Sequence, residues 1–378
     1  MIEAMVTVLD KRGHARIVED VVSGGSSAQR FDLRIRESWR RCLSTALLNP
    51  DRQRRPVIVA SAELRKRREQ VDPVYSIAQV EMAGLSRLLN APVGVMLTDH
   101  EGVILSYVGD SRFAEVARSS GLREGAVWSE VEQGTNGMGT CLVMRQPVLI
   151  QQEEHFLVQN TALTCCGAPI LDGSGRLVGA LNISGRLQLS AAPTLALVKL
   201  AVQNIENRAL LEGYRQHRLL RFHPHREFIA TAGEGILAID HQGRVVAANR
   251  GALDWLNAKH HAELYGKPIE MLVGLDMNQL ELLACRPEHA RPLPRRDFGL
   301  LCYGVLQTPL AESQGATSSG HARTRADNAL VRAERDTLLE VLQGCNWNVS
   351  LAATRLNISR RTLHRKLKAH GLRRYWVS

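Results

Sequence analysis

Three stretches of the chain place a short polar turn between two apolar runs, which is the pattern of a β-hairpin. The turns lie at residues 99–102, 172–175 and 240–243, and each contains an aspartate and a glycine. Helical patterns lie between these hairpins. Together they predict an α+β, multidomain fold with mainly antiparallel sheets.

Apolar residues at helical spacing predict two helical regions before the first hairpin. A helix is expected over 34–48, and its apolar face carries Ile35, Trp39, Cys42 and Leu43. A second helical run is expected over 61–90. Residues 1–30 contain GGSS and are predicted to be an irregular lead.

A long helix is predicted over 193–220, between the second and third hairpins. Its apolar residues recur at alternating spacings of three and four: Leu195, Val198, Val202, Ile205 and Ala209. This is the spacing of a coiled-coil seam, and it is equally that of a helix packed on its own domain. Residues 311–329 are polar and aperiodic, which is typical of a linker.

The C-terminal part has the pattern of three short helices, expected over 334–345, after the cap Asn348 and after the cap Ser359. The last two are joined by a short turn, as in a helix-turn-helix. In the third helix Leu363 and Leu367 are predicted to bury one face.

Positive charge is concentrated in the same region. The net charge of the 378 residues is +10, and from residue 331 onward ten Lys and Arg stand against three acids. A basic face on the last helix predicts binding in the major groove of DNA, the alternative being a solvated, charged helix. The expected DNA-binding residues are Ser359, Arg360, Arg361, Thr362, His364, Arg365, Lys368 and Arg373.

Composition limits the class of protein. The hydrophobic fraction of 44% is enough for ordinary cores, and neither a membrane-length apolar run nor a signal-peptide centre is present, so a cytoplasmic protein is expected. The seven cysteines are odd in number and form no C-x-x-C pair. They imply neither a disulfide framework nor a zinc site, and small buried apolar roles are expected for them.

The stretch 132–142, EQGTNGMGTCL, has three glycines within six residues. Such glycines either let backbone N–H groups approach a phosphate or shape a tight loop over a pocket. A phosphate loop needs Lys followed by Ser or Thr, and a dinucleotide loop needs G-x-G-x-x-G after a strand. Both are missing here, which argues against a nucleotide site.

Several motifs resemble one family of bacterial regulators. NWNVSLAATRLNISRRTLHRKLKAHGL resembles the Fis-type helix-turn-helix that closes enhancer-binding activators. RESWRRC, LTDHEGVIL, WSEVEQGTNGMGTCL and LTCCGAPILDGSGRLVGALNISG resemble the sensor of acetoin-catabolism activators, which in that family is a GAF domain. IATAGEGILAIDHQGRVVAANRGALDWL resembles the core of a PAS domain. The resemblance covers nearly all of the chain from about residue 35.

The resemblance implies six segments. They are an N-terminal helical extension (1–75), a GAF-like sensor domain (76–194), a connecting coiled-coil-like helix (195–225), a PAS-like domain (226–310), a linker (311–329) and a Fis-type DNA-binding domain (330–378). Activators of the family also carry an AAA+ ATPase before the DNA-binding domain. This chain has no P-loop motif and no GAFTGA, so sensing and DNA binding carry over by resemblance, but ATPase-driven activation does not.

The resemblance also places the glycine-rich loop beside a small-molecule cavity of the GAF domain. The expected effector-binding residues are the apolar Trp128, Met138 and Cys141 and the polar Thr135, Asn136, His155, Thr164 and Cys165, with Phe156 and Asn160 as further candidates. For each of them the alternative is a structural role. The family makes acetoin, other alcohols or diols, or small aromatics the expected effectors.

These observations predict a transcription regulator with no catalytic centre, cofactor or metal. Double-stranded DNA and a small effector are the expected partners, with RNA polymerase as a further one. A homodimer is expected because one recognition helix reads few bases. The alternatives are an adaptor for an ATPase-bearing activator, a redox or metal sensor at Cys165 and Cys166, and an enzyme using EEHF with the same cysteines. Adjacent strand residues point to opposite faces, which argues against the cysteine pair.

Overall fold

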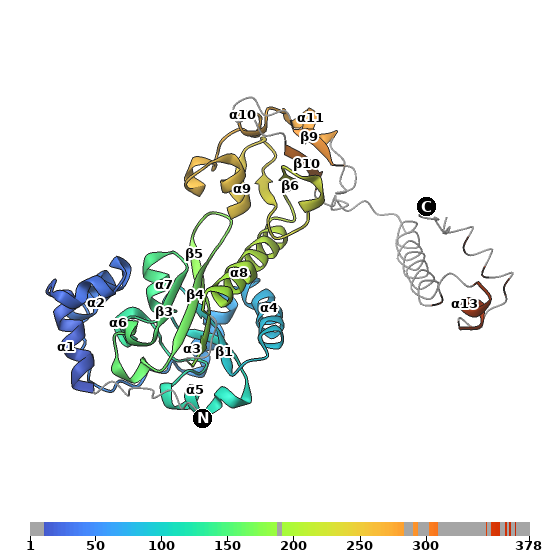
Figure 1. Ribbon diagram of the computed structural model, residues 1–378. Coiled ribbons are helices and arrows are strands. Elements are labelled where there is room, and N and C mark those ends of the chain that lie inside the picture. The colour runs from blue at the N-terminus through green and yellow to red at the C-terminus, as the bar shows by residue number, and fades with distance from the viewer. Residues whose placement is uncertain are drawn as a thin grey trace. The chain divides into compact units, whose positions relative to one another are not determined.

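The computed structural model describes residues 11–186, 191–282, 290–293 and 302–308, and further on 345, 349–355, 360, 363 and 367. The chain divides into two compact units, Met1–Leu310 and Ala311–Ser378. The first unit contains two five-stranded antiparallel sheets with helices (Figure 1). This confirms the predicted α+β class with antiparallel sheets. Among the described helices, none is long and apolar enough to cross a membrane.

The first sheet has the strand order β2-β1-β5-β4-β3, and every neighbouring pair is antiparallel. Its strands are β1 (Val93–Asp99), β2 (Ile104–Gly109), β3 (Val148–Gln151), β4 (Thr164–Leu171) and β5 (Leu177–Gly185). The hairpins predicted around residues 99–102 and 172–175 are β1–β2 and β4–β5, and both are confirmed.

One face of this sheet is covered by two helices, α4 (Val74–Leu89) and α8 (Ala191–Gly213). Val198, Val202 and Ile205 of α8 are at most 2% exposed and pack in one core with β1, β4 and β5. These are the residues of the predicted seam. The packed-helix alternative is therefore the one observed, because the seam is already covered within the chain.

The opposite face is covered by shorter helices and loops. They are α1 (Lys11–Val22), η1 (Ser26–Arg30), α2 (Leu33–Ser44), η2 (Ser111–Phe113), α5 (Ala114–Ser120), α6 (Glu130–Gln133), α7 (Gly139–Met144), η3 (Gln152–Glu154) and η4 (Val158–Asn160). The predicted face of α2 is confirmed, since Ile35, Trp39 and Cys42 are buried in this core. We refer to this side of the sheet as the loop layer.

Two helical predictions near the N-terminus need correction. Part of the predicted irregular lead is helix α1, which is amphipathic and buries Val18 and Val21 against the loop layer. The run predicted over 61–90 is divided into α3 (Ser61–Gln70) and α4, and Pro73 is the N-cap residue of α4. Proline removes a backbone donor and restricts the residue before it, so a continuous helix cannot form there.

The second sheet has the order β8-β7-β6-β10-β9. Its strands are β6 (Arg218–His223), β7 (Gly235–Ile239), β8 (Val245–Ala248), β9 (Arg291–Leu293) and β10 (Cys302–Gln307), accompanied by η5 (Arg226–Phe228), α9 (Arg250–Leu256), η6 (His261–Glu263), α10 (Ile269–Val273) and α11 (Met277–Glu281). The third predicted hairpin is β7–β8 and is confirmed.

The helix predicted over 193–220 is shorter than expected. It ends at Gly213, and residues 218–223 form β6 at the centre of the second sheet. Leu219 and Leu220 are both buried, one against α8 and β7 and the other in the core of the second domain. The second domain therefore begins before residue 226, where the sequence placed its boundary.

The two sheet domains meet through buried polar contacts at the end of α8. Arg250 at the start of α9 donates from Nε to Glu206 Oε2 at 2.7 Å and from Nη2 to the carbonyl of Pro169 in β4 at 2.8 Å. Asn249 donates to Asn207 Oδ1 at 2.7 Å. Glu206 also accepts the N–H of Leu171 at 2.7 Å. One carboxylate thus joins the first sheet, α8 and the second domain.

Candidate effector site and DNA-binding region

The glycine-rich stretch 132–142 forms a tight loop between α6 and α7. Asn136 holds this loop closed, since its Oδ1 accepts the N–H groups of Met138 and Gly139, both at 2.9 Å. Its Nδ2 donates to the carbonyls of Trp128 and Gly134. The amide of Asn136, an expected effector ligand, is therefore fully engaged in the loop.

The glycines of this loop are required by close packing. Gly134 has φ +64°, and a side chain there would collide with Phe156. A side chain at Gly139 would collide with the backbone of Glu130, and one at Gly137 with Asn182 and Cys165. The loop thus lies directly on β4 and β5, which agrees with a shaping role for its glycines.

The expected apolar residues lie deep in the loop layer. Trp128, Met138 and Cys141 are at most 1% exposed and share one core with Phe156. The Trp128 Nε1 donates to the carbonyl of Gly121 at 3.4 Å. These side chains carry much of the packing of the domain, and their role as the wall of an effector site stays a prediction.

A chain of buried polar groups crosses the sheet under the loop. His155 Nδ1 lies 3.0 Å from the carbonyl of Gln152, and its Nε2 lies 3.3 Å from Cys165 Sγ. Cys165 Sγ lies 3.1 Å from Ser184 Oγ, which accepts from Asn182 Nδ2 at 2.9 Å. The structure thus brings together two expected residues, His155 and Cys165.

Burial keeps the side chains of this hydrogen-bonded row uncharged. It lowers the pKa of His155 to about 4 and raises the pKa of Cys165 to about 11. A carbonyl can only accept, so the neutral His155 donates from Nδ1 and accepts at Nε2 from the Cys165 thiol. The donors then run in one direction, from Asn182 to the carbonyl of Gln152. Asn182 Oδ1 is left as an acceptor without a donor among the described residues.

Two more buried amides have no partner within the described part of the chain. They are Gln133 in α6 and Asn160 in η4, each 0% exposed, with both the oxygen and the nitrogen unpaired. Such groups are rare in protein interiors because each unpaired atom costs free energy. With Asn182 they are the buried amides of the loop layer whose hydrogen bonds the described residues leave incomplete.

Of these residues, Gln133, Asn182 and Ser184 were absent from the expected set. Asn182 and Ser184 alternate with Leu181 and Ile183 along β5, so the polar pair faces the loop layer and the apolar pair faces α4 and α8. Polar residues on one buried face of a strand were the available signal. Gln133 had no signal, since it ends a short polar helix.

The remaining expected residues have structural contacts. Thr135 Oγ1 lies 2.6 Å from Ser38 Oγ, and Thr164 is 3% exposed at the start of β4. Cys165 and Cys166 belong to the cores on opposite faces of the sheet, as the strand pattern predicted. The two thiols therefore do not converge on one site.

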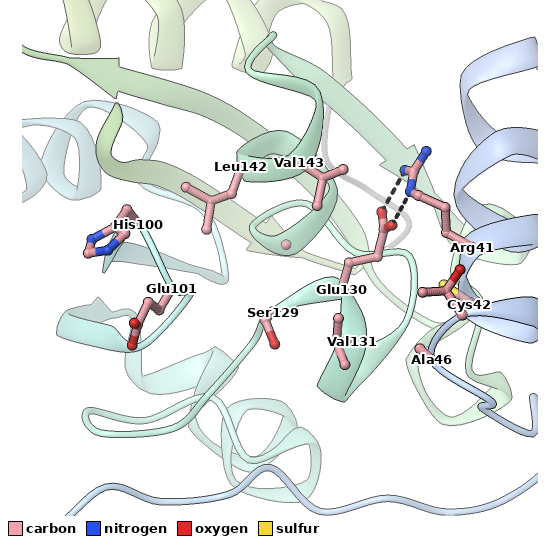
Figure 2. A pocket seen from close by; sticks show the side chains of 12 residues that line it. Arg41, Cys42, Ala46, His100, Glu101, Ser129, Glu130, Val131, Leu142 and Val143 are labelled. Atoms are coloured by element: carbon pink, nitrogen blue, oxygen red, sulfur yellow. Dashed lines mark hydrogen bonds and ion pairs between the residues drawn. The ribbon is translucent and has the colours of Figure 1, made fainter. Parts of the chain in front are cut away.

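The N-terminal helices close the loop layer with polar contacts. Ser38 donates to Glu130 Oε2 at 2.6 Å, and Arg41 binds the same carboxylate from Nε at 2.7 Å and Nη2 at 3.1 Å. His14 Nε2 lies 3.0 Å from the carbonyl of His155. A pocket of about 240 Å³ lies between α2, the β1–β2 turn, α6 and α7. Figure 2 shows Glu130 directed toward Arg41 at one side of this pocket, with His100 and Glu101 at the other.

The C-terminal unit is described at the residues that build its helices. Helix α13 (Val349–Arg355) follows the predicted cap, and Ala352 and Ala353 are buried as predicted. Leu363 and Leu367 are helical and buried, and Arg360 is helical and exposed, which fits the predicted orientation of the third helix. The other expected DNA-binding residues lie outside the described residues: Ser359, Arg361, Thr362, His364, Arg365, Lys368 and Arg373. The linker 311–329 also lies outside them.

Two protein families match the chain. The MimR N-terminal domain matches residues 15–207, and the Fis family of bacterial regulatory proteins matches residues 329–370. The first match extends from α1 through most of α8, the elements that share the cores of the first sheet. The second coincides with the predicted helix-turn-helix.

Three of the curated relatives that the chain resembles are transcription regulators. The acetoin catabolism regulatory protein of Cupriavidus necator is 32% identical over 320 residues, 79% of this chain and 48% of the relative. The acetoin dehydrogenase operon activator AcoR of Bacillus subtilis is 32% identical over 45% of this chain and 27% of the relative. The propane 2-monooxygenase operon activator MimR of Mycolicibacterium smegmatis is 29% identical over 61% of this chain and 42% of the relative.

Among solved structures, the Escherichia coli DhaR(N)–DhaL complex matches with 16% identity and a TM-score of 0.45, over 74% of this chain and 100% of that chain. The chain spans about half the length of the first curated relative, and less of the others. Because the MimR N-terminal model covers half of the chain and the relatives include the acetoin regulators, the predicted resemblance is confirmed. The chain belongs to the family of the MimR N-terminal domain, carries the Fis-family helix-turn-helix, and resembles the acetoin-type transcription regulators.

Proposed function

We propose that the chain is a sequence-specific DNA-binding regulator that senses a small hydroxyl-bearing metabolite in the loop layer of its first domain. The domain is proposed to be of the GAF type, and the domain with the second sheet of the PAS type. The unpaired buried amides of Gln133, Asn160 and Asn182 are the observation that carries the sensing proposal. Their polar atoms need partners that the described residues do not give them.

The chemistry of these atoms favours an alcohol or diol. Asn182 Oδ1 needs a donor, whereas Gln133 and Asn160 each offer a donor and an acceptor. A hydroxyl group both donates and accepts, so it can complete each of them. The buried walls from Trp128 and Met138 suit a small apolar carbon skeleton. Acetoin and related diols have both features, and acetoin appears in the names of two relatives.

The proposed transmission runs through α8. This helix packs on the first sheet, and Glu206 near its end binds Arg250 of the second domain. A change in the packing of the loop layer would move the sheet and reach the second domain through this helix. We propose a homodimer in the cytoplasm that binds two half-sites on double-stranded DNA and contacts RNA polymerase, because one recognition helix reads few bases.

We also propose that the chain acts without an ATPase of its own. Between β10 and the Fis-family match lie residues 308–328, and the sequence contains no P-loop motif. This same observation favours a second candidate function, an adaptor that works with an ATPase-bearing regulator.

Two measurements test the proposal. Acetoin, butane-2,3-diol and phenol are added to the purified chain, and a binder of the folded state must raise its melting temperature. Specific sites are then selected from a pool of random duplexes, and affinity for them is compared with random DNA. A shift with the diols and a specific site support the regulator. Specific binding that requires an ATPase-bearing relative would support the adaptor, and turnover of a ligand would contradict both.

A further inference from the structure

The first domain contains a second, larger cavity that none of the proposed functions uses. It is a cleft of about 970 Å³ between the segment 53–58 and helix α5, with Tyr107 and Gly109 of β2 among its lining residues. This volume lies in the range of small-molecule sites. We refer to it as the basic cleft, for the reason given next.

Arginines dominate the charged groups of the cleft. Four line it, Arg54, Arg55, Arg118 and Arg123, against a single acid, Asp110. The Asp110 carboxylate is already bound by Arg112, at 2.8 Å from Nε and 2.9 Å from Nη2. The acid therefore gives little compensation to the arginines.

Three of these arginines have no ion pair with any residue that the structure describes: Arg55, Arg118 and Arg123. Arg54 alone is paired, with Glu132 at 2.8 Å. Like charges around one cleft repel each other, and an anion placed among them removes that repulsion. Arginine also binds carboxylate and phosphate groups with two parallel hydrogen bonds.

The wall that carries Arg54 and Arg55 is held in place. Arg54 N–H donates to Gln159 Oε1 at 2.9 Å, and Gln159 Nε2 returns a bond to the Arg54 carbonyl at 2.7 Å. Val57 and Val59 exchange backbone bonds with Val127 and Gly125. The backbone of the segment is therefore a fixed wall of the cleft, from which Arg54 and Arg55 extend.

We infer that the basic cleft binds a small metabolite bearing a carboxylate or a phosphate, at a site separate from the hydroxyl-binding amides of the loop layer. The apolar lining residues Pro56, Ile58 and Leu122 suit a short carbon body attached to the oxyanion. A chain that senses a neutral alcohol in one site would then also sense an acidic metabolite in another.

The test measures binding of oxyanions to the full chain at constant ionic strength. Inorganic phosphate and succinate are titrated by calorimetry into the parent protein and into Arg118→Gln/Arg123→Gln. The charge-matched control is Arg65→Gln/Arg87→Gln, which removes two exposed arginines of α3 and α4 that do not line the cleft. Circular dichroism and the melting temperature without ligand establish that each variant folds.

We expect saturable binding of at least one oxyanion to the parent and to the control. Binding to the cleft variant should be about tenfold weaker or more, as expected for the loss of one charge-assisted hydrogen bond. Binding of phosphate alone would assign a phosphorylated metabolite, and binding of succinate alone an organic acid. Arg55 lies on the opposite wall of the cleft, and Arg55→Gln should weaken binding of the same anion.

Two results would overturn the inference: no saturable binding of either oxyanion, or an equal loss in the cleft variant and its control. Gel shifts with the selected DNA site separate this inference from the proposed function. The cleft variant should bind that site like the parent. If the parent and both variants all failed to bind specific DNA, the proposed regulator function would be contradicted, and the assignment of the cleft would be unaffected.

Discussion

Gln133 has an amide whose oxygen and nitrogen both lack a partner in a fully buried position. If the amide serves a ligand, the protein without ligand is destabilised by it. We predict that Gln133→Met raises the free energy of unfolding of the ligand-free chain by about 1 kcal/mol, because an apolar side chain of similar size removes the unpaired atoms. The same change should abolish the melting-temperature shift given by the effector.

Urea unfolding and thermal-shift titration measure the two effects, with the exposed Gln242→Met as control. A destabilised Gln133→Met that still responds to effector would show that the amide has a structural partner. This position is a sharper test than Trp128 or Met138. Both of those are buried in the core, and truncation to alanine would cost about 2–5 kcal/mol of stability by itself.

His155 predicts a dependence of stability on pH. Burial lowers its folded pKa from 6.5 to about 4, so between these values the unfolded chain binds a proton that the folded chain does not. The free energy of unfolding should therefore have its full value above about pH 6.5. Below that it should fall as the pH drops toward 4, by up to ~1.4 kcal/mol per pH unit. His14, whose pKa burial also lowers, adds to the same trend.

Urea unfolding at several pH values checks this. His155→Gln should flatten the dependence between pH 6.5 and 4, whereas the exposed His241→Gln should retain it. If parent and His155→Gln showed the same slope, the imidazole would not be the group that titrates.

At the scale of elements, the contact between α8 and α9 includes a largely buried ion pair between Glu206 and Arg250. Glu206 is 6% exposed, and burial raises its pKa while Arg250 opposes that rise. We predict that Arg250→Leu lowers the free energy of unfolding by about 3–5 kcal/mol, because it leaves an uncompensated buried carboxylate. The double variant Glu206→Leu/Arg250→Leu should recover most of that loss.

Urea unfolding measures the stabilities, and gel shifts with and without effector measure the coupling. The double variant should bind DNA and effector but lose the effect of one on the other. Full coupling in a stable double variant would mean that the signal does not pass through this pair.

The recognition helix carries the fourth prediction, which concerns residues outside the described set. Arg361, near the helix start, is expected to read a base, and Lys368, further along, to bind phosphate. Arg361→Ala should cost about 1–3 kcal/mol at the specific site and relax preference at one base position. Lys368→Ala should weaken all sequences alike and reduce the salt dependence by about one counterion per half-site. An unchanged ratio of specific to random binding for Arg361→Ala would place this helix outside the groove.

The elements that could be predicted from the sequence are those with a local signal. Each of the three hairpins has an aspartate that closes its turn, and all three are present. The length of α8 could not be predicted, because Leu219 and Leu220 fit a helix as well as a strand and only their pairing with β7 and β10 decides. Helix α1 was missed because its stability comes from packing on residues more than a hundred positions away, such as His155 and Phe156.

The candidate site divides in the same way. The burial of Trp128 and Met138 and the pair His155 and Cys165 follow from residue type within recognisable motifs. Gln133 and the basic cleft depend on which groups remain unpaired after folding, and a sequence does not show pairing. The count of charges also hid the cleft, because most of the net charge lies from residue 331 onward and the rest of the chain is nearly balanced.

At the scale of the whole molecule, the fifth prediction concerns energy use. The sequence has no P-loop lysine, so we predict that the purified chain hydrolyses no ATP and needs no nucleotide to act at a promoter. Release of phosphate measures ATP hydrolysis. To test the nucleotide requirement, promoter opening is carried out with a non-hydrolysable ATP analogue and transcription is then measured. Nucleotide-dependent opening by the pure protein would contradict this and favour the longer relatives' domain plan.

The proposed dimer would form through surfaces other than the apolar seam of α8. Val198, Val202 and Ile205 already pack on the first sheet, so the seam is covered within one chain. Sedimentation of the full chain tests the dimer itself. Substitution of these three residues should lower the folding stability of each chain and leave the association of folded chains unchanged.

The second sheet takes its central strand from the segment that directly follows α8. β6 lies between β7 and β10, and only residues 214–217 separate it from the helix that covers the first sheet. A fragment starting at residue 226 would lack this strand, and its remaining strands would form two separate pairs, β7 with β8 and β9 with β10. The two sheet domains therefore cannot be exchanged between regulators by a cut after β6. A functional chimera must keep β6 and the second sheet from one parent, and a junction before residue 191, where α8 begins, also keeps Glu206 with its partner Arg250.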